Sequence, residues 1–330
     1  MKQRIRQVTF REYGQPEVLQ LTESDLPVPG PGEIIVKVHA AGVNYSDILR
    51  RQNRYFMPTP LPFAPGAEVA GLVLETGEGV AAPFVPGARV LAILPQGGGY
   101  ATHVKAIAQY CVPLPPSIDD ATATGIFVQG STAQLMIDLL AGELAGKTVL
   151  INAAAGGVGS ILVQLAKQAG ATVIGAAGDR RKMAIAQTLG ADAAVDYTKP
   201  HWSEAVLQAN RGRSVDLVFE MVGGAVYEES LRCLADGGKL IVYGCASGVQ
   251  GKIHPEYFVD HGITQAGFNL AHIIQYQTAR WQEALGKVIG LLAAGKLQIH
   301  SPNRFDLDQA AAAHREIEAR NTVGKVVLLP

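Results

Sequence analysis

The chain has 330 residues, a length that predicts roughly two domains, and 48% of its residues are hydrophobic. Its formal net charge of -1 argues against nucleic acid or an anionic membrane as a partner, and favours an enzyme or a small-molecule binder. Three scattered cysteines, no signal peptide and no run of the roughly 18 apolar residues that a membrane span needs predict a cytoplasmic protein without disulfides.

Short strands separated by turns are predicted up to about residue 110. The β-branched or alternating segments are "RQVTF", "VLQLTE", "EIIVKVHAAG", "EVAGLVLETG", "ARVLAI" and "ATHVKAI". Turns rich in Pro and Gly, such as "PVPGPGE" and "PTPLPFAPG", punctuate them. This pattern predicts an antiparallel, partly closed β body.

The pattern changes near Ser117, where a long helical run begins in which Gly130 is a candidate break. Apolar strands then alternate with helices predicted at 158–169, 180–189, 202–210 and 225–235. The strands are "KTVLIN", "ATVIGAA", "AAVDY", "VDLVFEMV" and "KLIVYG". Because such alternation is typical of a buried parallel sheet, we predict one doubly wound domain over residues 129–270.

Residues 271–330 return to a different pattern. They contain two helical segments, "WQEALGKVIGLLAAGKL" and "DQAAAAHREIEAR", and a final strand in "GKVVLLP". We predict that this tail rejoins residues 1–128 in one domain, and a separate third subdomain is the alternative.

The segment "AAAGGVG" joins the strand at 147–152 to the helix that follows it, and nearly matches the dinucleotide pattern G-x-G-x-x-G. Ala154 takes the first place, Gly156 the second and Gly159 the third. The second glycine lets the backbone approach a pyrophosphate, and the third permits close packing of helix on strand. A tight turn without a ligand is the alternative. The loop residues predicted to bind the cofactor are Ala155, Gly156, Gly157, Val158 and Gly159.

The end of the second strand indicates which dinucleotide binds. A carboxylate about 20 residues after the glycine loop would bind a free ribose 2′-OH, but Ala177 and Gly178 stand there. Arg181 and Lys182 follow and can pair with a 2′-phosphate, so NADPH is favoured over NADH. Two alternatives stay open: Asp179 reaching the ribose, or "DRRK" being only the solvated start of a helix.

Several motifs together resemble one protein family. They are "PGPGEIIVKVHAAGVN", "GVNYSD", "FAPGAEVAGLVLETG", "VQGSTA", "AAAGGVG" and the tail "GKVVLLP". As a set they resemble the zinc-independent quinone oxidoreductase (zeta-crystallin-like) branch of the medium-chain dehydrogenase/reductase superfamily, over nearly the whole chain. The resemblance implies an α/β fold: a GroES-like catalytic domain (1–128 and 271–330), a Rossmann domain (129–270), and a homodimer joined through an edge strand such as "ITQAGFNL".

The resemblance also indicates that no metal is bound. Zinc-dependent relatives carry a catalytic Cys where this chain has Asn44 and a His where it has Ala67. They also carry a four-cysteine lobe where "LAILPQGGGY" runs straight through. Because tetrahedral zinc needs three or four protein ligands, we predict a zinc-free enzyme. Such an enzyme would reduce an electrophilic small-molecule acceptor, a quinone or an α,β-unsaturated carbonyl compound.

Site residues follow from the same resemblance. Asn44 would lie near the nicotinamide and Tyr55 would line the acceptor cleft, so these are the predicted catalytic residues. Helix capping for Asn44 and ordinary packing for Tyr55 are the alternatives. Where relatives read R-x-G-x-Y this chain reads "RQNRY", which leaves the acceptor open. The other implied cofactor contacts are Thr132, Tyr197, Gly244, Ser247 and Arg320.

We therefore predict an NADPH-dependent oxidoreductase that transfers hydride to a quinone or an enone, with Tyr55 or solvent as the proton source. An enoyl-thioester reductase or another alkene reductase of the same fold is one alternative. A non-catalytic NADPH-binding protein, as in the crystallin branch, is the other.

Overall fold

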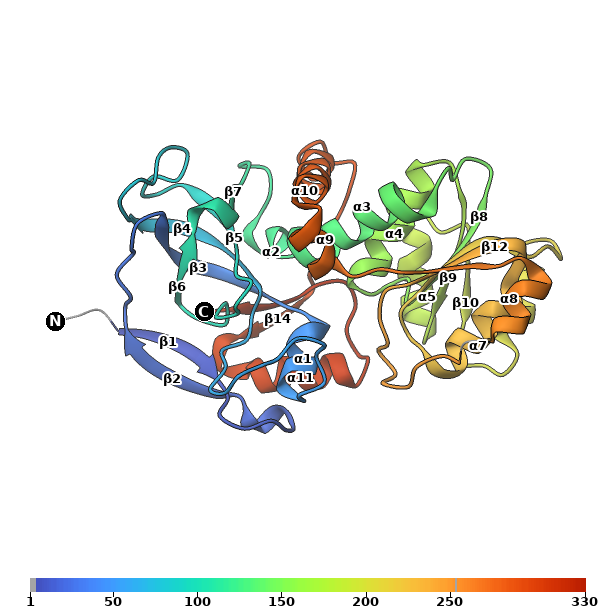
Figure 1. The fold of residues 1–330 in the computed structure, drawn as a ribbon, viewed down its shortest axis with the longest axis horizontal. Coiled ribbons are helices and arrows are strands. Elements are labelled where there is room, and N and C mark those ends of the chain that lie inside the picture. The colour runs from blue at the N-terminus through green and yellow to red at the C-terminus, as the bar shows by residue number, and fades with distance from the viewer. Residues whose placement is uncertain (1–3, 253) are drawn as a thin grey trace. The chain divides into compact units, whose positions relative to one another are not determined.

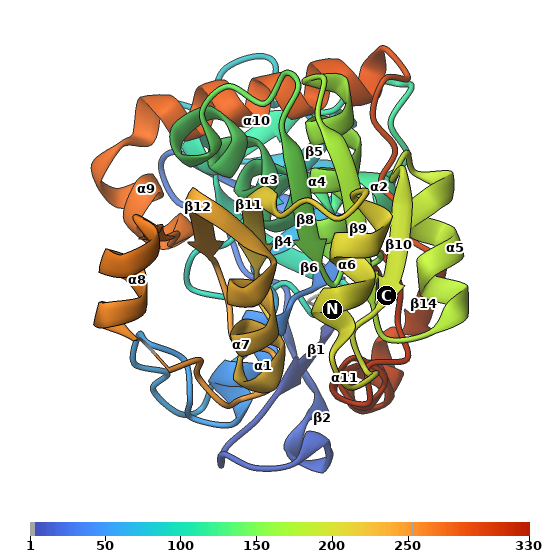
Figure 2. The ribbon, with the colours of Figure 1, turned by 90° about the vertical axis from the view of Figure 1, so that its right-hand side faces the viewer.

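The computed structural model describes residues 4–252 and 254–330, which form two compact units. One unit comprises residues up to Val128 together with Ile299–Pro330, and the other comprises Gln129–Gln298. The first boundary is the predicted one. The return to the first unit comes later than the predicted residue 271, because helix α10 (Thr278–Ala293) packs against α3 (Ser131–Met136) of the second unit, as Figure 2 shows.

A mixed sheet forms the body of the first unit, with strand order β14-β15-β3-β4-β5-β7 and β6 paired to β3. Its tail strand β15 runs antiparallel to β3, so the chain end rejoins the β body as predicted. A separate hairpin joins β1 and β2. The strands are β1 (Arg4–Thr9), β2 (Gln20–Asp25), β3 (Glu33–Val43), β4 (Glu68–Thr76), β5 (Arg89–Ile93), β6 (His103–Ile107), β7 (Cys111–Pro113), β14 (Asn303–Asp306) and β15 (Val326–Leu329).

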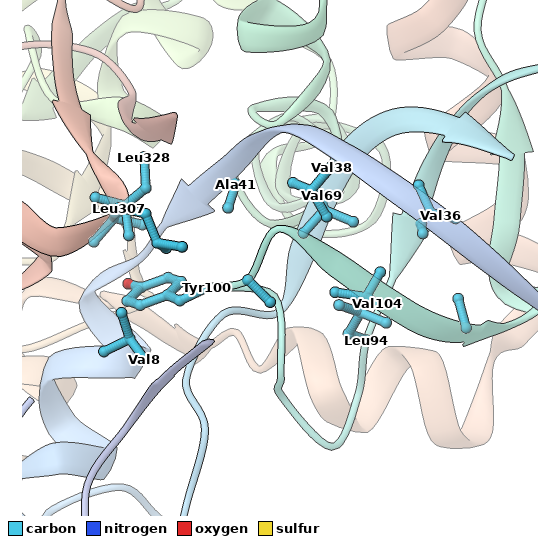
Figure 3. Packing of buried hydrophobic residues seen from close by; sticks show 14 of the residues in the cluster. Val8, Val36, Val38, Ala41, Val69, Leu94, Tyr100, Val104, Leu307 and Leu328 are labelled. Atoms are coloured by element: carbon cyan, nitrogen blue, oxygen red, sulfur yellow. The ribbon is translucent and has the colours of Figure 1, made fainter. Parts of the chain in front are cut away.

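Alternate residues of the β3 strand fill the core of this unit. Ile34, Val36 and Val38 are buried in one cluster with side chains from β4, β6 and β15, as the period of two in a strand requires. Tyr100 is buried in the same cluster, where Val8, Leu307 and Leu328 surround its ring (Figure 3). The short helices of this unit are α1 (Tyr45–Arg51), α2 (Asp120–Ala123) and α11 (Ala310–Glu318).

The second unit is a parallel sheet with strand order β10-β9-β8-β11-β12-β13 (Figure 2). Strands predicted from apolar runs form all of it except β13. The strands are β8 (Thr148–Asn152), β9 (Thr172–Ala177), β10 (Ala193–Asp196), β11 (Val215–Glu220), β12 (Leu234–Val242) and β13 (Thr264–Gly267). The helices are α4 (Gly157–Gln168), α5 (Arg180–Thr188), α6 (Trp202–Ala209), α7 (Gly224–Cys233), α8 (Pro255–His261) and α9 (Leu270–Tyr276), with α3 and α10.

Both faces of this sheet are buried. In β8, Leu150 packs into a cluster with Val206 of α6 and Leu231 of α7, while its neighbours Val149 and Ile151 point to the opposite face and are equally buried. Helices therefore cover both faces, as the doubly wound prediction requires. The chain order reverses between β8 and β11, and ligands of such sheets bind at this switch point.

The helical run before β8 corrects one prediction. Gly130 was the candidate break, but its dihedral angles, φ -65° and ψ -51°, are helical. The helix continues through this position but changes its hydrogen-bonding pattern, because π-helical turns at Ile126–Gly130 and Ile137–Ala141 flank α3. Within residues 4–252 and 254–330, no helix combines the length and the apolar character that crossing a bilayer requires.

Candidate functional site

The glycine loop lies at the carboxyl end of β8, at the switch point. Ala153 has a positive φ of 51°, and its carbonyl accepts the N–H of Gly156 at 2.8 Å. Helix α4 then begins at Gly157, and no side chain of the described residues caps its N-terminus. The first N–H groups of α4 are thus left for a ligand, and such a terminus favours phosphate.

An added side-chain carbon would meet other atoms of the protein at two glycines of the loop. A Cβ at Gly159 would collide with the carbonyl oxygen of Ala153, and one at Gly157 would collide with the amide of Gln129. The absence of a side chain at Gly159 therefore permits the close packing of helix α4 on strand β8. The alanine in the first place also has a reason: a Cβ on Gly175 of β9 would lie 3.0 Å from the methyl group of Ala154, which therefore occupies that space.

The end of β9 has the character predicted for NADPH. Ala177 is buried, and the ring of Tyr197 lies over Gly178, where a Cβ would come within 3.5 Å of it. Asp179 caps α5: its Oδ1 accepts the backbone N–H of Lys182 at 2.8 Å, and this bond holds the pKa of Asp179 below its usual range. Because Asp179 caps the helix, reaching a ribose would cost it this bond.

The Lys182 ammonium also lies 3.5 Å from Asp179, at the same end of the strand as Ala177. Arg181 is exposed beside it. Thus the structure brings together Ala177, Gly178, Arg181, Lys182 and Tyr197 at one corner of the sheet.

Two buried polar residues that the sequence did not single out end the central strands of this sheet. Oε1 of Glu220 accepts the N–H groups of Val222 and Gly223 at 2.7 and 2.9 Å. Its Oε2 has no hydrogen-bond partner among the described residues, and neither has Oδ1 of the neighbouring Asn152. An acid and an amide at the carboxyl ends of apolar strands were the available signal.

Hydrogen-bond donors fix the orientation of that amide. Ser230 donates its hydroxyl to the carbonyl of Val226 at 2.7 Å, so it must accept from Nδ2 of Asn152, also at 2.7 Å. Asn152 also contacts the Glu220 carboxyl, and this contact acts to lower the pKa of Glu220. Burial has the larger effect and raises the pKa of Glu220, because it disfavours the charged carboxylate.

The loop after β12 closes onto the same edge. The N–H groups of Ala246 and Ser247 donate to the carbonyls of Met221 and Val222, both at 2.8 Å, and Gly244 faces Met221. The predicted residues Gly244 and Ser247 therefore lie next to the carboxyl end of β11. Thr132 is buried in α3, a helix that packs on α4 in the same unit.

In the first unit, Asn44 belongs to a buried group with Glu68 and Lys325. Its Nδ2 donates to Oε1 of Glu68 at 2.8 Å, and its Oδ1 accepts from Nζ of Lys325 at 2.8 Å. The ammonium also donates to Glu68 at 2.6 Å, and neither charged side chain is exposed. Gly42 makes this possible, since a Cβ there would lie 2.7 Å from Glu68 and 2.8 Å from Lys325.

Asn44 also immediately precedes α1. It therefore caps this helix and at the same time takes part in the buried group with Glu68 and Lys325. Its backbone N–H donates to Oδ2 of Asp47 at 2.9 Å, and Asp47 also accepts from the N–H of Gly66. Burial raises the pKa of Asp47, while these two bonds act in the opposite direction. The segment that carries Asn44 is thus anchored on both sides.

A second buried chain of hydrogen bonds ties α1 to α11, which Figure 1 shows side by side. The hydroxyl of Tyr100 lies 3.1 Å from both Asp47 and Nε2 of His314. Nδ1 of His314 faces the guanidinium of Arg51, which pairs with Glu318 at 2.7 Å. Because Tyr100 donates to Asp47 and Arg51 can only donate, His314 must be neutral and protonated on Nε2. Burial, with the charge of Arg51, lowers the pKa of His314 to about 3.

Tyr55 lies in the loop after α1. Its ring is stacked under the guanidinium of Arg50, 4.3 Å from the ring centroid, and contacts Phe56. Burial raises the pKa of Tyr55. Arg320, just after α11, has a positive φ of 58° and lies in the first unit with Asn44 and Tyr55. The remaining predicted cofactor contacts all lie in the second unit.

The predicted zinc positions offer poor ligands. The Asn44 amide is engaged by Glu68 and Lys325, and Ala67 has no donor atom. Among residues 4–252 and 254–330, no three His, Cys, Asp or Glu side chains gather into a metal-binding group. That the enzyme works without zinc stays a prediction.

A β body is followed by a parallel sheet that carries the glycine loop 153–159, here called the glycine cradle, at its switch point. This combination defines a two-unit, dinucleotide-binding dehydrogenase or reductase. Residues 157–289 match the family model of the zinc-binding dehydrogenases, and residues 30–116 match that of the alcohol dehydrogenase GroES-like domain.

Whole-length relatives specify the branch. The chain is 33% identical over 331 residues to a 2-haloacrylate reductase of Burkholderia sp, covering 97% of this chain and 98% of that protein. It is also 33% identical over 327 residues to a quinone oxidoreductase of Pseudomonas aeruginosa, covering 98% and 99%. The structure of Escherichia coli quinone oxidoreductase complexed with NADPH matches with a TM-score of 0.91 at 29% identity, covering 98% of this chain and 100% of that one.

The chain belongs to the quinone oxidoreductase branch of the medium-chain dehydrogenase/reductase superfamily. The predicted pairing of a GroES-like domain with a Rossmann domain is confirmed, as is the prediction of an oxidoreductase.

Proposed function

We propose that this oxidoreductase reduces small quinones or α,β-unsaturated carbonyl compounds with NADPH and without zinc. The main observation that supports this proposal is the glycine cradle, with Gly157 and Gly159, followed by a strand that ends on Ala177 instead of a carboxylate. NADPH is the cofactor, in keeping with solved relatives from Escherichia coli and a mycobacterium that are complexed with it. The backbone of the loop would hold the pyrophosphate, and Lys182 and Tyr197 the 2′-phosphate.

When bound, NADPH supplies a hydride equivalent, and the acceptor takes up that hydride and one proton to leave NADP⁺. The chain's own residues would orient the reactants and exclude water from the site. Glu68 and Lys325 hold both ends of the Asn44 amide, so this amide would present one fixed orientation to a ligand. The hydroxyl of Tyr55, or a water molecule beside it, would supply the proton.

A direct test follows the oxidation of NADPH by absorbance, with 1,4-benzoquinone and simple enones as acceptors. A parallel fluorescence titration measures NADPH binding to the folded protein. Binding with turnover of at least one acceptor class supports the proposal. Binding without turnover of any acceptor contradicts it and favours the non-catalytic alternative.

An alkene reductase is the second candidate. The name of the Burkholderia relative, 2-haloacrylate reductase, supports it, because that substrate is an alkene conjugated to a carboxylate. We also propose the predicted homodimer, with the β13 segment as the joining edge, since β13 pairs only with β12 among the described residues. Sedimentation of the purified protein tests this assembly.

A further inference from the structure

Arg50 and Arg51 are adjacent on α1, but their surroundings differ sharply. Arg51 is fully buried and paired with Glu318, and it also donates to the carbonyl of Gly14. Arg50 is only partly buried, and none of the ion pairs formed within residues 4–252 and 254–330 includes it. Its Nη1 makes one long hydrogen bond, 3.4 Å, to the hydroxyl of Thr59.

Aromatic rings hold the Arg50 guanidinium in place. Its central carbon lies 4.3 Å from the ring centroid of Tyr55 and 5.3 Å from that of Phe63. The guanidinium carries five N–H donors, more than its contacts with Thr59 and Tyr55 use. Its planar edge has the fork geometry that binds the two oxygens of a carboxylate. The charge is therefore held in place and partly buried, and no carboxylate of the part of the chain that the structure describes pairs with it.

The neighbourhood of Arg50 is that of the proposed acceptor site. Asn44 stands immediately before the same helix, and six residues of helix span about 9 Å. Tyr55 is the ring under the guanidinium. Phe56 and Met57 follow in the loop, and their side chains are 62% and 44% exposed, so apolar surface adjoins the cation. A cation next to exposed apolar side chains suits a ligand that is both anionic and apolar.

We propose that Arg50 binds a carboxylate of the electron acceptor, so that the preferred acceptors are small unsaturated carbonyl compounds that also carry a carboxylate. This inference rests on the proposed function and narrows its substrate class. In the reaction the alkene takes a hydride equivalent on one carbon and a proton on the other while NADPH becomes NADP⁺. The carboxylate itself is unchanged, and its bond to Arg50 only holds the acceptor.

The test compares 3-benzoylacrylate with its methyl ester, in which a neutral ester group replaces the charged carboxylate. The measured quantity is the ratio of kcat/KM for the acid to that for the ester. We expect the native ratio to favour the acid, and Arg50→Gln to lower the ratio on the order of ten- to hundredfold, the effect of losing hydrogen bonds to a charged group. Arg50→Lys should retain part of the native preference for the acid, since an ammonium binds as a point charge.

Arg54→Gln is the matched control, because it removes the same charge from an exposed arginine four positions further on. It should change the ratio by less than about twofold, since interactions of exposed charges are weak. An equal fall in Arg54→Gln would overturn the proposal in favour of a general charge effect. So would an equal loss for acid and ester in Arg50→Gln, which would mean that Arg50 only packs the loop.

Binding of the product separates this inference from the proposed function. The reduced acid, 3-benzoylpropionate, and its methyl ester are titrated by calorimetry into the protein saturated with NADP⁺. Tighter binding of the acid that is lost in Arg50→Gln supports the carboxylate site even if no acceptor is turned over. Equal binding of acid and ester to the native protein rejects it, even if quinones are reduced.

Discussion

Nζ of Lys325 and Oε1 of Glu68 form an ion pair at 2.6 Å in which neither side chain is exposed. Both members of the pair also hydrogen-bond the side-chain amide of Asn44, and Oε2 of Glu68 accepts the N–H of Val128. Breaking a buried pair leaves an uncompensated charge, whereas removing both charges does not.

Lys325→Met should therefore lower the free energy of unfolding by about 3–5 kcal/mol, measured by urea denaturation at neutral pH. The double change with Glu68→Gln should recover much of that loss, because the unpaired carboxylate is gone. Equal stabilities for Lys325→Met and the native protein would contradict the buried pair.

His314 predicts a loss of stability in acid. Its pKa in the folded protein is about 3, below the value of about 6.5 in an unfolded chain. Its contribution is therefore complete above pH 6.5 and disappears as the pH falls towards 3, by up to about 5 kcal/mol. His314→Gln retains an acceptor for Arg51 and a donor for Tyr100, and should flatten the fall between pH 6.5 and 4. Unfolding titrations with the same slope for both proteins would refute this.

Glu220 predicts the opposite dependence. Burial raises its pKa, so its contribution is complete below about pH 4.5 and is lost as the pH rises through the value in the folded protein. Glu220→Gln keeps the shape and still accepts the N–H groups of Val222 and Gly223. The variant should be at least as stable as the native protein at pH 8, with the difference shrinking towards pH 4. A variant that is less stable at pH 8 would show that Glu220 is ionised.

The glycine cradle predicts a difference between two alanine substitutions. At Gly159 the new Cβ meets the backbone oxygen of Ala153, which can move only with the strand–helix unit, so Gly159→Ala should weaken NADPH binding tenfold or more and cost about 1–3 kcal/mol of stability. At Gly157 it meets the flexible end of Gln129. Adding Gln129→Ala should rescue Gly157→Ala but not Gly159→Ala in a fluorescence titration. If Gln129→Ala rescued both variants, the predicted collision between Gly159→Ala and the backbone of Ala153 would be wrong.

The corner at the end of β9 predicts the cofactor preference. Lys182→Ala and Arg181→Ala should each raise the dissociation constant for NADPH about tenfold, as loss of a hydrogen bond to a charged phosphate implies, and leave that for NADH within about twofold. Titrations with both cofactors measure this. Equal losses for the two would show that these cations do not contact the 2′-phosphate.

Local patterns in the sequence predicted most of the fold. The apolar run 147–152 became β8, "ATVIGAA" became β9, and helix α4 begins one residue before its predicted start. These elements depend on neighbours two to four positions away, so their residues carry the signal. Gly130 was misread for the same reason: a glycine weakens a helix locally, but here the helix is buried and its packing overrides that cost.

By itself, the sequence determined the family, and it predicted the dinucleotide loop and the NADPH-like corner, because each of the motifs involved is a short contiguous segment. Only the tertiary structure showed that Asn44 is held by Lys325, 281 positions away, that His314 completes a chain to Asp47, and that Glu220 meets Asn152. Whether a charged side chain is buried, and against which partner, depends on how distant segments pack. The same packing of α10 on α3 moved the return of the chain to residue 299, where no local pattern changes.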